Sequence, residues 1–199
     1  MDLPLTRPAT RPERADAARN RARVLAAAER LFAERGATEV SMEDIARAAG
    51  VGKGTLYRRY PDRAALAVAL LDEHERRLQQ QLLDGPPPLG PGAPPARRLA
   101  AFYAAMVELL EQHRELALVA ETGAARYRTG AYAFWRAHVH ALLVEADVDD
   151  PDGVLAELLL APLAVDLQQR LRSRGAGTAD LAAALGVLAR GVLAPAGPA

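Results

Sequence analysis

Apolar residues recur along this chain of 199 residues at every third or fourth position, which is the spacing of amphipathic helices. The periodic segments stop at glycine or proline, the residues that most often end a helix. No segment alternates apolar and polar residues over the length of a strand, and no internal repeat is visible. The sequence therefore predicts an all-α protein of about nine helices.

The expected helix bounds follow from the caps and breakers at each end. Pro162 lies inside a continuous apolar pattern and should kink the helix that contains it. The stretch GPPPLGPGAPP at 85–95 holds three glycines and six prolines in eleven residues, which predicts a loop. A proline-rich recognition site is the alternative there. We expect helices over residues 16–35, 41–49, 52–60, 62–83, 97–113, 115–121, 125–146, 152–174 and 178–192.

The second and third of these helices form a closely joined pair. Ser41 can cap the second helix, and Asp44 stands three residues later, where a capping-box acid belongs. Gly50 supplies the positive φ that ends this helix. In the third helix, Leu56 and Tyr60 lie one turn apart on the inward face, and the proline that follows ends the helix.

The outward face of the third helix carries chemistry that suits DNA. Lysine and arginine can reach guanine in the major groove, threonine can touch a base or a thymine methyl, and tyrosine can bind a phosphate. A bare glycine lets a backbone come close, and a helix N-terminus favours an anion. The pattern is typical of a helix-turn-helix, although an ordinary helical hairpin with a solvated basic face is the alternative. The face consists of Lys53, Gly54, Thr55, Tyr57, Arg58 and Arg59.

The same stretch resembles the N-terminal domain of TetR/AcrR-type transcriptional regulators. The resemblance rests on IARAAGV, GKGTLYRRY and PDRAAL, and it is close over residues 20–71, whereas the rest agrees only in helical layout. Gly52 stands where the family more often has Ser or Thr, which weakens the cap of the third helix. Tyr60 replaces the commoner Phe, and Arg63 replaces the usual Lys while keeping its charge.

The resemblance implies further roles. Ser41 would bind a phosphate as well as cap its helix, and Arg63 would stand for the family's phosphate-contacting lysine. The helix over 62–83 would join the DNA-binding domain to the rest of the chain and pass motion between them. The expected DNA-binding residues are therefore Ser41, Lys53, Gly54, Thr55, Tyr57, Arg58, Arg59 and Arg63.

The chain divides into three expected parts. Residues 1–15 hold three prolines and several arginines, and they predict a flexible basic arm that either follows DNA or is a solvated tail. Residues 16–63 form the helix-turn-helix DNA-binding domain, with the motif itself at 41–60. Residues 64–199 form a helical domain for effector binding and dimerisation, which contains the Pro/Gly-rich loop at 85–95.

Charge is distributed unevenly, although its sum over the whole chain is zero. Residues 1–63 carry 13 Lys/Arg against 9 Asp/Glu, whereas the remainder carries 12 against 16, so the basic part is the one that would face DNA. The absence of cysteine excludes disulfides and thiol chemistry. No run of 18 apolar residues and no signal-peptide core is present, so we expect a cytoplasmic, nucleoid-associated protein without a membrane partner.

The last helices carry more apolar surface than one small bundle easily hides. Their leucines form stripes at helical spacing, flanked in the final helix by alanine and glycine that would let another helix approach closely. We expect a two-fold four-helix interface between two copies, which the resemblance also implies, whereas plain core packing is the alternative. The expected dimer residues are Leu158, Leu163, Leu167, Leu181, Leu185, Leu188 and Val192.

The middle helices hold most of the aromatic side chains of the second half. Together with a few polar tips they could line an apolar pocket for a small molecule, and packing within the core is the alternative for each residue. The resemblance implies that a bound effector would change the spacing of two DNA-binding domains and release DNA. The expected pocket residues are Phe102, Tyr103, Met106, Tyr127, Tyr132, Trp135 and His138.

Metal and catalytic chemistry find little support. His138 and His140 stand two residues apart on a helix and point in nearly opposite directions, so they cannot share one metal ion. No nucleophile elbow, phosphate-cradling loop or dinucleotide fingerprint occurs, so we expect no enzyme, no catalytic residue and no cofactor.

The function expected from these observations is that of a homodimeric transcriptional repressor, which binds a palindromic operator in double-stranded DNA and is released by an unknown small-molecule effector. An activator, or a DNA-binding protein without effector control, is the nearest alternative. An all-α bundle that binds or converts small molecules, with a hairpin that does not bind DNA, is the alternative from another class.

Overall fold

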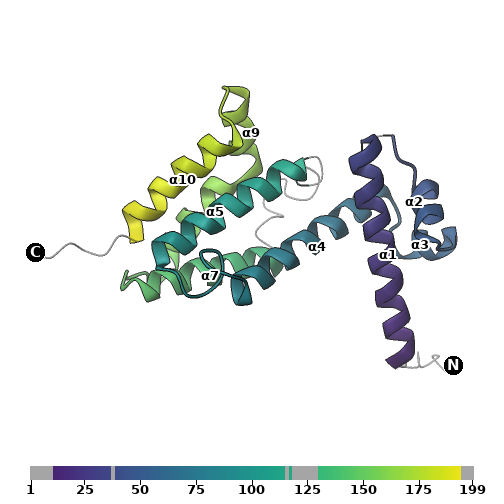
Figure 1. The fold of residues 1–199 in the computed structure, drawn as a ribbon, viewed down its shortest axis with the longest axis horizontal. Helices are drawn as coiled ribbons and strands as arrows, with labels where there is room; N and C mark the ends of the chain where they lie inside the picture. Colours follow the sequence, from purple (N-terminus) through teal and green to yellow (C-terminus); the bar gives the residue numbers. More distant parts are fainter. Residues whose placement is uncertain (1–10, 37–38, 115–116, 118–129, 194–199) are drawn as a thin grey trace, which may run out of the picture. The chain divides into compact units, whose positions relative to one another are not determined.

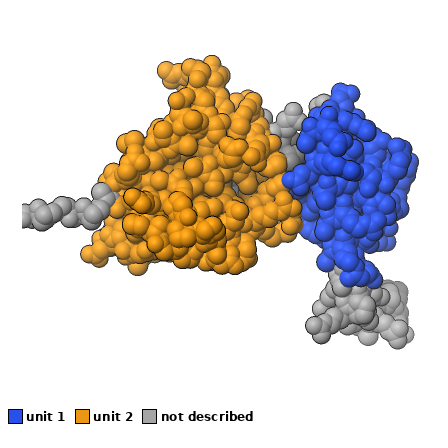
Figure 2. Space-filling model, in the orientation of Figure 1, with its two compact units in different colours: residues 1–70 blue, residues 71–199 orange. Residues whose placement is uncertain are grey.

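The computed structural model describes residues 11–36, 39–114, 117 and 130–193, and within these ranges all regular structure is helical. Nine α-helices and one short 3₁₀ helix are present in the described residues, and they fall into two compact units, residues 1–70 and 71–199 (Figures 1 and 2). The expected all-α fold is confirmed.

Unit 1 consists of α1 (Arg11–Arg35), α2 (Met42–Ala49), α3 (Lys53–Arg59) and the first turns of α4 (Arg63–Asp84). α1 packs against α2, and α2 against α3 (Figure 1). The helix expected from residue 16 already begins at Arg11, so residues 11–15 belong to a helix and not to the predicted arm. The side chains that are buried in this unit come from all four helices and include Leu25, Ala28, Ile45, Leu56, Leu66 and Leu70.

The boundary between the units lies at residues 70 and 71, seven residues later than the expected division between 63 and 64. Leu66 and Leu70 on the first two turns of α4 are buried and belong to unit 1. Asp62 caps α4, because its Oδ1 accepts a hydrogen bond from the Ala65 amide at 2.7 Å.

Unit 2 contains the remainder of α4 and a bundle of α5 (Pro95–Gln112), α7 (Gly130–Glu145), α8 (Val154–Leu160), α9 (Val165–Ser173) and α10 (Thr178–Leu193). α10 lies along α5, and α7 packs against both α5 and α8 (Figure 1). Their buried faces form one core, with Leu99, Phe102, Tyr103, Met106, Trp135, Val139, Leu142, Leu143, Leu159, Leu160, Leu181 and Leu185 among its members.

Pro162 breaks its helix rather than kinking it, so the single helix expected over 152–174 is wrong. α8 ends at Leu160, the 3₁₀ turn η2 (Ala161–Leu163) follows, and α9 restarts after Ala164, whose backbone is extended. Proline removes an amide donor and clashes with the preceding turn, and here the chain leaves the α-helix for four residues, 161–164. The carboxylate of Asp150 caps α8 by accepting the amides of Leu155 and Ala156 at 2.9 and 3.0 Å.

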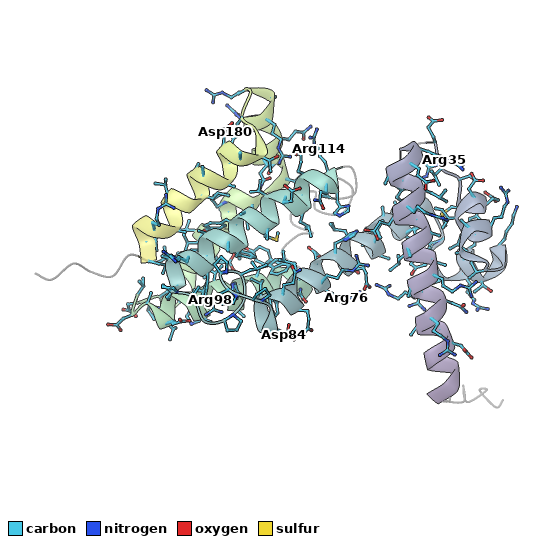
Figure 3. All side chains as sticks on the ribbon, in the orientation of Figure 1. Arg35, Arg76, Asp84, Arg98, Arg114 and Asp180 are labelled. Atoms are coloured by element: carbon cyan, nitrogen blue, oxygen red, sulfur yellow. The ribbon has the colours of Figure 1, made fainter. Side chains whose placement is uncertain are left out.

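The loop expected at 85–95 is present but ends one residue sooner, because Pro95 is the first residue of α5. Proline fits this position, since the first amide of a helix has no partner to lose. Arg98 on the first turns of α5, labelled in Figure 3, forms an ion pair with Glu145 at the end of α7, with 2.7 Å between the charged atoms. None of the described helices is long and apolar enough to cross a membrane.

Candidate nucleic-acid interface

The turn between α2 and α3 is built by local hydrogen bonds that the sequence encodes. The Ser41 hydroxyl accepts the Asp44 amide at 3.1 Å, while the Asp44 carboxylate accepts the Ser41 amide at 3.3 Å, so the expected capping box is confirmed. The Ser41 hydroxyl also donates to Asp44 at 2.7 Å, and this bond is the main reason that the pKa of Asp44 lies below its ordinary value. Gly50 ends α2 with φ of 61°, as expected.

Arg23 of α1 holds this turn from outside. Its guanidinium donates to the carbonyl oxygen of Gly50 at 2.9 Å, across 27 positions of sequence. An added Cβ at Gly50 would lie 2.5 Å from the same guanidinium, so the bare glycine gives Arg23 its access. The sequence offered no signal for this contact, because helical periodicity does not say which residues of different helices meet.

The structure divides the side chains of α3 as the periodicity predicts. Leu56 is buried, and so is Tyr60 directly after the helix. Gly52 at the N-cap makes no side-chain capping bond, which confirms the expected weak cap. All six residues of the predicted DNA-facing set on α3 are exposed, namely Lys53, Gly54, Thr55, Tyr57, Arg58 and Arg59.

Glu43 of α2 is a member of this surface that the sequence reasoning missed. Its Oε1 accepts a hydrogen bond from the Tyr57 hydroxyl at 3.2 Å and lies 3.6 Å from the Lys53 ammonium nitrogen. The pKa of Glu43 lies below its ordinary value, first because the carboxylate accepts its own backbone amide and then because Tyr57 and Lys53 stabilise the charge. Desolvation and the Glu43 carboxylate raise the pKa of Tyr57. One carboxylate thus holds two of the predicted DNA contacts.

A groove of about 470 Å³ lies between α1 and α3 in unit 1. Three cations and one acid line it beside the exposed face of α3, namely Arg21, Arg58, Arg59 and Asp16. The Tyr60 hydroxyl at its wall is buried and has no hydrogen-bond partner among the described residues. A groove with this charge is suited to an anionic group such as a phosphate.

The two remaining predicted DNA contacts lie at the edges of the motif. Ser41 is half-buried with its hydroxyl bonded to Asp44, and Arg63 is exposed on the first turn of α4. Their contacts with phosphate stay a prediction.

The predicted effector residues come together, but they do so as packed core. Phe102 lies 5.6 Å from Trp135 and 5.4 Å from His138 between ring centroids, and both Phe102 and Tyr103 are fully buried. The Tyr103 hydroxyl donates to the Leu159 carbonyl at 2.8 Å, and burial raises its pKa. Met106 and Trp135 belong to the same core, and Tyr132 packs against it with its hydroxyl on Glu157. Tyr127 lies outside the described residues.

His138 and Gln168 of unit 2 have buried polar atoms without a hydrogen-bond partner among the described residues. Burial and the charge of Arg98 lower the pKa of His138 from 6.5 to about 4, and its Nε2 has no partner among the described residues. Gln168 of α9 is only 3% exposed, and neither its amide oxygen nor its nitrogen has a partner there. An unsatisfied buried amide costs about 1–3 kcal/mol, which makes it a candidate contact for a bound molecule.

The predicted dimer residues separate into two groups. Leu163 on η2 and Leu181 and Leu185 on α10 are buried in the chain's own core, and their place in a dimer interface stays a prediction. An apolar stripe predicts burial but not which helix covers it. Leu158, Leu167 and Leu188 are exposed, and Val192 is half-buried. No group of three His, Asp or Glu side chains with metal-binding geometry occurs in the part of the chain that the structure describes.

Comparisons with known proteins agree with this geometry. Residues 24–70 match the family model described as bacterial regulatory proteins, tetR family. The chain is 43% identical over 61 residues to an uncharacterised HTH-type transcriptional regulator of Mycobacterium tuberculosis, covering 31% of this chain and 30% of that protein. It is equally similar over 61 residues to TtgR of Pseudomonas putida, covering 30% and 29%. The chain therefore spans about a third of the length of the curated relatives that it matches.

Solved structures extend the likeness to most of the chain. A tetR-family transcriptional regulator from Streptomyces coelicolor superposes with a TM-score of 0.60 and 19% identity, covering 87% of this chain and 79% of that one. NalD of Pseudomonas aeruginosa, described as the secondary repressor of the MexAB-OprM multidrug efflux pump, gives 0.53 at 22% identity, covering 89% and 98%. At such identities the likeness establishes the fold.

Proposed function

We propose that the chain is a TetR-type transcriptional regulator with a DNA-binding helix-turn-helix, and that it is a homodimeric repressor. It binds a palindromic operator in double-stranded DNA, acts on the chromosome in the cytoplasm, and leaves the operator when a small-molecule effector binds unit 2. The observation that carries the proposal is the exposed face of α3, which presents two arginines, a lysine, a threonine and a tyrosine on a turn held by the capping box and Arg23.

We assign two kinds of DNA contact to this face. Lys53, Thr55 and Arg58 reach base edges in the major groove, where lysine and arginine bind guanine and threonine binds a base or a thymine methyl. Tyr57 and Arg59 bind phosphates, together with Ser41 and Arg63 at the edges of the motif. The groove between α1 and α3 adds Arg21 to the phosphate-binding set.

Dimerisation supports operator recognition. One α3 reads only a few base pairs, whereas two copies on a two-fold axis read two half-sites about one helical turn apart or a multiple of it. Leu158 and Leu167 are exposed apolar side chains on α8 and α9, and Leu188 is one on α10. A second copy that covers these side chains removes their apolar surface from water, and this burial stabilises the dimer.

The effector site is proposed in unit 2. Gln168 supplies a buried, unsatisfied amide that can donate and accept. A molecule that binds one spacing of the two DNA-binding units more tightly than the other shifts the dimer away from DNA. NalD, which has this fold, is a repressor of an efflux pump, and this agrees with the repressor role proposed here.

Selection of genomic DNA tests the proposal. Sheared DNA is retained on the purified wild-type protein and on a Tyr57→Ala, Arg58→Ala variant, and the retained fragments are sequenced. The proposal expects wild type to enrich a palindromic site and the variant to lose it. Enrichment of the same DNA by both proteins, or of none by wild type, would remove α3 from DNA recognition. An operator that overlaps a promoter supports a repressor, and one placed upstream supports an activator.

A further inference from the structure

We propose that Glu43 is a specificity-determining residue, which keeps Lys53 and Tyr57 from binding phosphates of the wrong DNA. The inference rests on the proposed function, because it concerns how the same helix-turn-helix separates operator from other DNA. Glu43 contacts no base in this proposal. It acts through the two donors that it holds, and it is therefore a positioning residue.

The geometry places one carboxylate oxygen at both donors. Glu43 Oε1 lies 3.2 Å from the Tyr57 hydroxyl and 3.6 Å from the Lys53 ammonium, and Glu43 itself is half-buried on the first turn of α2. Its charge is stabilised by its own backbone amide at that helix N-terminus as well as by the two donors of α3. Lys53 and Tyr57 are both exposed on the surface of unit 1. In the protein without DNA, both side chains contact Glu43.

The Glu43 carboxylate competes with phosphate for the same donors. Binding to non-operator DNA comes almost wholly from phosphate contacts, so a donor held by Glu43 contributes little to it, and the carboxylate also repels nearby phosphates. Binding to the operator adds base contacts. An ammonium group has three donors, so Lys53 can keep its ion pair with Glu43 and still donate a hydrogen bond to a guanine edge. Glu43 thus lowers affinity for the wrong DNA more than affinity for the operator.

The test compares wild type with Glu43→Gln, which keeps the size and an acceptor for Tyr57 but removes the charge. The matched control is Glu34→Gln, since Glu34 is an exposed acid of α1 that makes no ion pair or side-chain hydrogen bond with the described residues. Affinities for a selected operator and for a random duplex of equal length are measured over a series of salt concentrations. Circular dichroism melting establishes that each variant is folded.

The expected result is a gain on random DNA of about threefold to fivefold for Glu43→Gln, with a smaller change on the operator. The dependence of log affinity on log salt should become steeper by about one unit, because Lys53 gains a phosphate. Adding Lys53→Ala to Glu43→Gln should abolish both changes.

Three results would overturn the inference. Glu43→Gln could bind random DNA no more tightly than wild type, Glu34→Gln could give the same gain, or the gain could survive Lys53→Ala. In each of these cases wild type still prefers the operator, so the proposed function stands. Failure of wild type to bind any duplex at low salt overturns the proposed function itself and this inference with it.

Discussion

At the scale of single residues, Gly50 is the position where the helix-turn-helix depends most on backbone conformation. It combines a φ of 61° with a carbonyl that Arg23 holds at 2.9 Å. Gly50→Ala should lower the free energy of unfolding by about 1–2 kcal/mol, since an L side chain is strained there and its Cβ displaces Arg23. Urea denaturation measures the loss.

Gly54→Ala is the matched control for that substitution. Gly54 lies inside α3 without a positive φ, and an added Cβ there meets nothing within 4 Å. The control should raise the free energy of unfolding by about 0.5–1 kcal/mol, because alanine favours the helix. Equal effects of the two substitutions would contradict the role given to the turn.

Lys53 and Tyr57 are neighbours on one surface, yet we expect them to affect DNA binding differently. Lys53→Ala should cost about 1–3 kcal/mol on the operator and relax the preference at one base position, because it removes a base contact. Tyr57→Ala should weaken operator binding without changing the preference at any base position, because phosphates carry no sequence information. Binding to a set of single-base operator variants distinguishes the two. A Lys53→Ala protein with unchanged sequence preference would show that Lys53 reads no base.

His138 should make the stability of unit 2 depend on pH. The unfolded chain takes up this proton near pH 6.5, whereas the folded chain does so only near the pKa of about 4 that burial imposes. Neutral His138 therefore contributes its full stability above pH 6.5, and the contribution is lost as the pH falls toward 4, by up to about 1.4 kcal/mol per pH unit. His138→Phe should flatten this slope in urea denaturation, whereas His140→Gln should retain it. If the stability of His138→Phe depends on pH as steeply as that of wild type, then a group other than His138 causes the dependence.

At the scale of elements, α3 lacks a capping side chain. Gly52 has extended backbone angles suited to an N-cap, and an added Cβ there would lie 3.9 Å from its nearest neighbour. Gly52→Ser should therefore supply the missing bond and stabilise α3 by a few tenths of a kcal/mol, or about twofold in protection of its first amides. Amide hydrogen exchange measures this, with Gly54→Ser as the control away from the cap. Equal protection in both variants would argue against capping as the cause.

How far the sequence could predict each element depended on the range of the interactions that form it. The box of Ser41 and Asp44 and the turn at Gly50 involve residues within five positions, so they could be predicted. The bonds from Arg23 to the turn and from Tyr57 to Glu43 span 27 and 14 positions, and no local pattern encodes such pairs. Pro162 was recognised as a disturbance, but whether proline kinks or ends a helix depends on the packing around it.

At the scale of the whole molecule, apolar patterning predicted how much surface must be covered but not which element would cover it. Leu181 and Leu185 were expected at a dimer interface because they form a stripe on the last helix. The structure covers that stripe with α5 of the same chain. What remains uncovered lies at other positions of α8 and α10, with Leu158 63% exposed and Leu188 37% exposed. Residual exposure is therefore better evidence for an interface than the stripe itself.

The dimer can be tested at these uncovered positions. Leu158→Arg combined with Leu188→Arg places charges in the proposed interface, and burying an unpaired charge should raise the dissociation constant of the dimer at least about thirtyfold, or 2 kcal/mol. Wild type should sediment at twice the chain mass of 21.2 kDa, and the variant as a monomer at micromolar concentration. Val144→Arg is the control, because Val144 is an equally exposed apolar residue on α7, outside the proposed face.

Operator binding connects this prediction to function. A monomer reads one half-site, so the double variant should bind the full palindrome no more tightly than a single half-site, whereas wild type and Val144→Arg should prefer the palindrome strongly. Analytical ultracentrifugation and DNA titration on the same preparations measure both properties. If the double variant stays dimeric, the interface lies on other surfaces. If it is monomeric and still prefers the palindrome, two-fold symmetry is not what selects the operator.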